Sequence, residues 1–189
     1  NIPTDARQVH IRETFLRFEQ VTGYLRYLAG DTRLMGITRV SKRMQDSSIS
    51  ISLGMHADQT ILSDQASYGM WGLYSSAMRD TGLVQDEQRS LTPLGMLIAE
   101  NIETSLNKKA LTDLITKTGK LTSNVLRRHA TTFLEAIQNK PVQTSLAESL
   151  MGGNQSNLIQ RELWALTRKK RIEGELNIEV ADFIEATKN

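Results

Sequence analysis

The feature that most constrains the fold is the pattern of apolar residues, Gly and Pro in residues 82–95. An apolar, helix-like stretch ends at Gly82. Leu83 and Val84, which follow it, suit a half-buried strand, and a polar loop then leads to residues 91–95. Gly82 can end a helix in the left-handed conformation, and Pro93 suits the first turn of a new helix. The sequence therefore predicts a helix, two short paired strands and a second helix, with residues 83–84 paired near residues 91–92.

Apolar residues of the second helix recur at helical spacing. We expect this face to pack on the hairpin in one buried core, made of Leu83, Val84, Leu91, Leu94, Leu97 and Ile98.

Composition indicates a folded protein without a disulfide framework. Hydrophobic residues make up 39% and charged residues 23% of 189 residues, and there is no Cys. No apolar run approaches the roughly 20 residues that span a bilayer, and no signal-peptide pattern follows Asn1. Because Asn1 is not an initiator Met, we expect that preceding residues were removed or lie outside this sequence. We expect a cytoplasmic protein with no membrane partner.

The sequence Gly-Leu-Val followed by Leu-Thr-Pro-Leu-Gly resembles the winged helix-turn-helix of bacterial regulators. The resemblance implies a unit at residues 58–107, with a recognition helix at residues 66–81. That helix has Arg79 as its only base, whereas DNA reading needs polar and basic side chains. We therefore expect core packing or a protein interface there, formed by Met70, Trp71, Leu73 and Tyr74.

Residues 141–189 also resemble a winged helix. The pattern predicts a short helix at 144–150, a turn at 151–154 and a second helix at 156–169, capped by Ser156 or Asn154. A possible small wing at 171–176 and a terminal helix follow. With an amino-terminal unit at 1–57 and connecting helices at 108–140, the expected fold is mainly α, with two winged-helix-like units and a few short β-strands.

Helical phase places polar and basic side chains on one face of the second unit. This face carries Asn157, Arg161, Trp164 and Arg168, opposite Ile159, Leu163 and Leu166. Such side chains can contact base edges and phosphates. The predicted DNA-binding set adds Lys169, Lys170 and Arg171, with Lys108, Lys109, Arg127 and Arg128 as an extension. Alternatively, Trp164 packs against the amino-terminal helices and the basic run is simply solvated.

Three further segments have patterns of their own. An apolar face predicts a helix to about Ala29, with a possible kink at Gly23, and residues 33–43 form a basic segment of uncertain structure. Residues 48–53 alternate like a short strand, although a helix is an alternative. Residues 108–139 are predicted helical, with a break near residues 118–119.

No local motif indicates catalysis. His10, His56 and His129 are scattered, and phosphate-loop, dinucleotide-binding and nucleophile-elbow patterns are missing. We expect no enzyme activity, no cofactor and no metal site. The leading hypothesis is a DNA-associated protein whose second unit binds duplex DNA; the alternatives are an adaptor or assembly subunit with a protein partner or homo-oligomer, and a ligand-sensing regulator.

Regional charge offers a way to separate the first two hypotheses. Residues 1–57, 58–104, 105–141 and 142–189 carry net charges of +3, −5, +5 and −1. A continuous positive stripe that joins Arg161 and residues 168–171 to the basic helices of residues 105–141 favours DNA. An exposed apolar patch with divided charge favours an adaptor.

Overall fold

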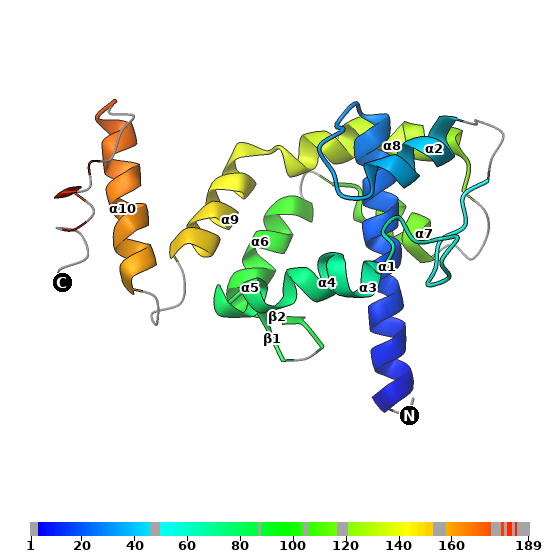
Figure 1. The fold of residues 1–189 in the computed structure, drawn as a ribbon, viewed down its shortest axis with the longest axis horizontal. Helices are drawn as coiled ribbons and strands as arrows, with labels where there is room; N and C mark the ends of the chain where they lie inside the picture. The colour runs from blue at the N-terminus through cyan, green and yellow to red at the C-terminus, as the bar shows by residue number, and fades with distance from the viewer. Residues whose placement is uncertain are drawn as a thin grey trace.

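In this computed structural model, the long helix α1 (Thr4–Leu28) contributes its carboxy-terminal half to the main core, and its amino-terminal end projects away from the other helices (Figure 1). The structure describes residues 4–45, 50–86, 88–103, 106–116, 121–152, 158–174, 179, 181–182 and 184. Helices α2 (Ile37–Gln45), α7 (Lys108–Thr116) and α8 (Ser123–Ile137) pack against α1. The described part of the chain is mainly helical, with one two-stranded antiparallel sheet, and this confirms the coarse fold class.

The main core joins segments that are far apart in the sequence. Ile51 and Leu121 form an isolated antiparallel bridge that brings the loop after α2 to the start of α8. The bridge agrees with the expected strand only at Ile51, and residues 46–49 lie outside the described residues. The buried side chains of this core are Val21, Tyr24, Leu25, Val40, Ile51, Leu53, Ile61, Leu114, Ile115, Leu121, Leu126, Ala130 and Phe133.

Two arginines of α2 hold the loop that follows it. Arg43 donates to the hydroxyl of Tyr24 at 2.8 Å and to the carbonyl of Gln59 at 2.9 Å. Arg39 donates to the carbonyl of Leu62 at 2.9 Å. Guanidinium groups satisfy loop carbonyls that have no partner in regular secondary structure. The basic segment of uncertain structure is therefore helical from Ile37, and these two charges have structural partners.

A buried amide and carboxylate network connects α1 to α3 (Gln65–Tyr68). Gln20 bonds both the N–H and the carbonyl of Gly54, at 3.0 and 2.7 Å. Gln65 donates to Glu19 at 2.9 Å and accepts from the N–H of Ile61 at 3.0 Å. Each amide thus has partners for its donor and acceptor atoms, as buried polar groups require.

The expected recognition helix at residues 66–81 is wrong as a single helix. It is divided into α3, α4 (Met70–Leu73) and α5 (Ser75–Asp80). Gly69 is extended, with φ −87° and ψ −169°, and the Glu19 carboxylate accepts the N–H of Met70 at 3.1 Å. A Cβ at Gly69 would collide with Glu19 and with the Gln65 carbonyl, so close packing on α1 interrupts the helix here.

The predicted hairpin is confirmed. Strands β1 (Val84–Gln85) and β2 (Ser90–Leu91) are antiparallel, with Val84 opposite Leu91. Gly82 has φ +70° and ends α5 with paired bonds, from its own N–H to Arg79 and from the Leu83 N–H to Met78. Helix α6 (Pro93–Glu103) follows, and the Thr92 hydroxyl accepts the N–H of Gly95 at 3.1 Å, as an N-cap does.

The expected core of this unit is partly wrong. Leu83, Val84 and Ile98 are buried, but Leu91, Leu94 and Leu97 are 41%, 41% and 57% exposed. The reason is the rotation of α6 about its axis. Gly95 faces the hairpin so closely that a Cβ there would collide with the Leu83 carbonyl, which places Leu94 and Leu97 on the flank.

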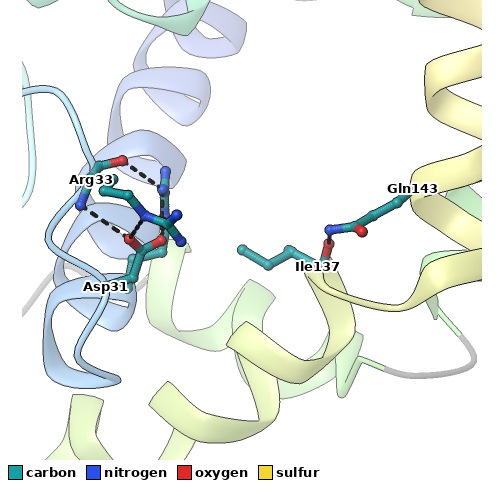
Figure 2. Close-up of polar contacts among 5 residues, drawn as sticks. Asp31, Arg33, Ile137 and Gln143 are labelled. Carbon is teal, nitrogen blue, oxygen red and sulfur yellow. Dashed lines mark hydrogen bonds and ion pairs between the residues drawn. The ribbon is translucent and has the colours of Figure 1, made fainter. Parts of the chain in front are cut away.

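Helix α9 (Lys140–Gly152) packs against α6 and α10 (Leu158–Ile172), which lies at the far left of Figure 1. The turn before α9 is fixed by Gln143, whose amide donates to the carbonyl of Ile137 at 3.2 Å (Figure 2). The expected helix at 144–150 is present but starts earlier, at Lys140, and the expected turn at Met151 is wrong, because Met151 and Gly152 still belong to α9.

The expected wing at 171–176 is also wrong at its start, because Arg171 and Ile172 continue α10. The proposed caps Asn154 and Ser156 lie outside the described residues, as do residues 175–178. None of the helices in the described ranges is long and apolar enough to cross a bilayer.

Candidate functional site

Exposed apolar side chains are concentrated between residues 68 and 97. This segment holds seven of the twelve exposed large apolar side chains found in the described part of the chain. We call these seven the apolar surface: Tyr68, Leu73, Tyr74, Leu91, Leu94, Met96 and Leu97. Contiguous exposed apolar patches mark interaction sites more often than isolated exposed apolar residues do.

The predicted protein-interface residues divide into anchors and exposed groups. Trp71 makes an edge-on contact with Phe15, with ring centroids 5.3 Å apart, and the Arg89 guanidinium stacks 3.4 Å from its centroid. Met70 is half-buried. Leu73 and Tyr74, however, are 54% and 47% exposed. Trp71 therefore holds α4 on α1 and the hairpin, and Leu73 and Tyr74 contribute to the apolar surface.

Arg89 fastens the hairpin to α4. Its Nε donates to the Ser75 hydroxyl at 2.8 Å, and one Nη donates to the Trp71 carbonyl at 3.1 Å. A cavity of about 300 Å³ next to Arg89 is also lined by Arg79 and Gln8. Because several donors of Arg89 are already engaged, we assign this arginine a structural role.

On α6, Leu94 and Leu97 are three residues apart and occupy one flank of the helix. Leu91 lies beside the hairpin-facing side of α6, because one of its methyl carbons is 3.2 Å from the position that a Cβ on Gly95 would occupy. Sequence periodicity identified these leucines as apolar but assigned them to the core. Gly95 is the sequence signal that separates the hairpin-facing side of α6 from its exposed side, because this small residue lies where the helix contacts the Leu83 backbone.

A second feature is the groove between α9 and α10, with a volume of about 460 Å³. Trp164 is half-buried in this groove. It therefore packs beside α9 instead of against the amino-terminal helices. The groove is lined by Lys140, Gln143, Thr144, Ala147, Glu148, Trp164, Thr167, Arg168 and Arg171.

The predicted DNA-binding cations of α10 have different surroundings. Arg168 pairs with Glu148 at 2.9 Å, and Lys170 pairs with Asp182 at 3.3 Å. Arg161, Lys169 and Arg171 are exposed. Asn157 lies outside the described residues. Of the described members of this set, Trp164, Arg168 and Arg171 share the groove.

The predicted extension of this basic region lies at the other end of the molecule. Lys108 and Lys109 are on α7, Arg127 and Arg128 are on α8, and both helices lie across the molecule from α10 (Figure 1). Lys108 also pairs with Glu103. The two basic regions are therefore not brought together, and the positive charge is divided.

Sequence reasoning missed the α9 side of the groove. Lys140, Gln143 and Thr144 are spaced as one helical face, but the sequence pattern predicts a helix only from residue 144. An earlier helix start at Asn139, whose side chain accepts the Val142 N–H at 3.4 Å, is the local signal for this face.

Within the described ranges, no group of three or more His, Asp or Glu side chains is arranged to hold a metal ion. No family model matches the chain, and comparisons with curated proteins and solved structures also find no match.

Proposed function

We propose that this protein is a non-catalytic interaction subunit, in which the winged-helix-like residues 58–107 bind another protein through the apolar surface. The observation that carries this proposal is the concentration of exposed apolar side chains on one unit of the chain. The separation of the two basic regions also supports it, because divided charge gives no continuous track for a nucleic-acid backbone.

The charge of the same unit indicates the chemistry of the partner. Residues 58–107 carry seven acidic and two basic side chains, and one of the basic residues is Arg89, which is engaged with Trp71 and Ser75. Glu100 is exposed on α6, one turn after Leu97. A complementary partner presents an apolar face bordered by Lys or Arg, with charge guiding association and apolar burial supplying affinity.

Site-specific photocrosslinking in the cell of origin tests this proposal. A photoreactive amino acid at Leu97 should capture a defined partner, whereas the same group at Met55 should not. Met55 is the matched control because it is 46% exposed and lies outside the apolar surface. The partner recovered should then lose affinity for the purified Leu94→Ser, Leu97→Ser variant, while the variant keeps its helical circular-dichroism spectrum. Equal crosslinking at the two positions would contradict the proposal.

Duplex DNA binding by α10 is the second candidate. It is favoured by three exposed cations, Arg161, Lys169 and Arg171, on a helix in which no side chain of residues 161–174 is buried. Replacing Lys169, Lys170 and Arg171 with Ala should weaken binding to all duplexes and reduce the salt slope by roughly one for each lost phosphate contact. Replacing Arg161 alone should instead change sequence preference. No duplex binding at low salt would exclude this candidate.

A further inference from the structure

The groove between α9 and α10 combines an aromatic ring with cations and hydrogen-bonding groups. Its volume of about 460 Å³ falls in the range of small-ligand sites. Trp164 lines it from α10, together with Arg168 and Arg171 at the spacing of one helical face. Lys140 lines it from α9. An anion that also carries a flat ring matches this lining.

The cations of the groove are not equivalent. Arg168 is already paired with Glu148 at 2.9 Å, and both side chains are partly exposed. Lys140 and Arg171 have no carboxylate partner within the described part of the chain, and both are exposed. These two side chains can therefore donate hydrogen bonds to a phosphate without first breaking an ion pair.

The position of Trp164 discriminates between kinds of nucleic acid. Bases inside a duplex are stacked on both sides, so their faces are not accessible to a ring that is half-buried between two helices. An unpaired base has a free face that can stack on an aromatic side chain. Gln143, Thr144 and Thr167 also line this groove. The Gln143 amide and the Thr167 hydroxyl already donate to backbone carbonyls, so the side-chain oxygens of these two residues are what they offer to a base.

We propose that the α9–α10 groove binds an unpaired nucleotide, with the base stacked on Trp164 and the phosphate held by Lys140 and Arg171. The site is separate from the apolar surface, so it neither requires nor excludes a protein partner there. It also differs from duplex binding, because Arg161 and Lys169 lie outside the groove lining.

Titration of the full chain at low salt tests the proposal, with four probes: adenosine monophosphate, a short labelled oligodeoxythymidylate, a matched duplex and inorganic phosphate. The mononucleotide and the single strand should quench tryptophan fluorescence, and the quenching should disappear in Trp164→Phe, which keeps Trp71. Equal affinity for both probes indicates a free nucleotide as the ligand, and tighter binding of the oligonucleotide indicates a strand. Either result supports the shared base-and-phosphate chemistry.

Variants on both helices provide independent readouts. Trp164→Ala should weaken binding at least about fivefold, since base stacking on an aromatic contributes that much or more. Lys140→Ala with Arg171→Ala should weaken binding and lower the single-strand salt slope by roughly 0.7 for each lost contact. Glu148→Gln should tighten binding, because it removes the negative charge next to Arg168. Lys169→Ala is the matched control with an exposed cation outside the groove.

Three results would overturn the proposal. The first is an absence of binding by both the mononucleotide and the single strand at low salt. The second is duplex binding that equals single-strand binding and is unaffected by Trp164→Ala. The third is weaker, not tighter, binding by Glu148→Gln. This last variant changes one exposed side chain, so it keeps the test valid even if Trp164→Ala does not fold.

Discussion

Gly95 shows how one residue sets the orientation of a helix. Its backbone meets the Leu83 carbonyl with no space for a Cβ, and Ile98, one turn later, is buried on the same side. The absence of a side chain therefore lets α6 approach the hairpin. The same contact directs Leu94 and Leu97 away from the core.

Replacing Gly95 with Ala should destabilise the protein by about 1 to 3 kcal/mol, because overpacking displaces backbone or side chains. The added methyl cannot be accommodated by rotating a flexible side chain, since its nearest neighbour is the backbone carbonyl of Leu83. Urea denaturation checks this, with Met96→Ala as the control on the exposed side of the same helix. An unchanged midpoint for Gly95→Ala would reject the close contact.

Glu19 should make stability depend on pH. Burial raises the pKa of its carboxyl, although the hydrogen bonds from Gln65 and Met70 oppose this. Between the ordinary value of 4.5 and the raised folded pKa, the folded protein binds more protons than the unfolded chain. The free energy of unfolding should therefore fall as pH rises through that window. Denaturation across pH should show this decline in the parent and a flatter profile in Glu19→Gln.

Asp31 should act in the opposite direction at lower pH. Hydrogen bonds from Arg26 and from the Arg33 N–H lower the pKa of its carboxyl from 3.8 to about 2, and Figure 2 shows Asp31 beside Arg33. Its stabilising contribution is present above pH 3.8 and is lost as pH falls towards 2. Acid denaturation of Asp31→Asn should lack this component. An acid transition identical to that of the parent would contradict the assigned ion pairs.

At the scale of elements, local sequence patterns around the hairpin predict where helices begin and end better than they predict which side of a helix is buried. Gly82, Thr92 and Pro93 determine a helix end, a cap and a helix start through neighbouring backbone groups, so the hairpin and α6 could be predicted from sequence. The division of residues 65–80 could not, because it depends on Glu19, which is about fifty positions away and accepts the Met70 N–H. Apolar periodicity likewise identified leucines on α6 without showing which side meets the hairpin.

Neighbouring residues of α6 give a direct test of its orientation. Ile98 is 5% exposed and Leu97 is 57% exposed. Ile98→Ala should cost about 2 to 5 kcal/mol, the usual range for a buried aliphatic side chain. Leu97→Ala should change stability by no more than about 0.5 kcal/mol, as surface substitutions do. Chemical denaturation of both variants checks the orientation, and a larger loss for Leu97→Ala would reverse it.

At the scale of the whole molecule, the main core joins the amino-terminal segment to α7 and α8, which the sequence suggested were connecting helices. Their apolar groups were visible in the sequence, but the Ile51 and Leu121 bridge that aligns them spans seventy positions without a local signal. For the candidate sites, sequence identified Trp164, Leu73 and Tyr74. It could not place Lys140 opposite Trp164, because a groove depends on two helices at once.

The position of α10 leads to a prediction about the whole chain. No side chain of residues 161–174 is buried, and α10 lies far from the α1 core (Figure 1). Ending the chain after Gly152 should therefore change the free energy of unfolding of the core by less than about 1 kcal/mol, since little apolar area is uncovered. Leu126→Ala in α8 is the control for sensitivity, because its fully buried side chain should cost about 2 to 5 kcal/mol.

Thermal and urea denaturation followed by circular dichroism measure both changes. The truncated chain should keep a cooperative transition and should also lose the nucleotide site, because Trp164 and Arg171 are removed. A loss of several kcal/mol on truncation would mean that α10 stabilises the core. Retained stability with lost nucleotide binding would instead separate the roles of the two parts, with α1 and α8 maintaining the fold and α9 and α10 forming the ligand site.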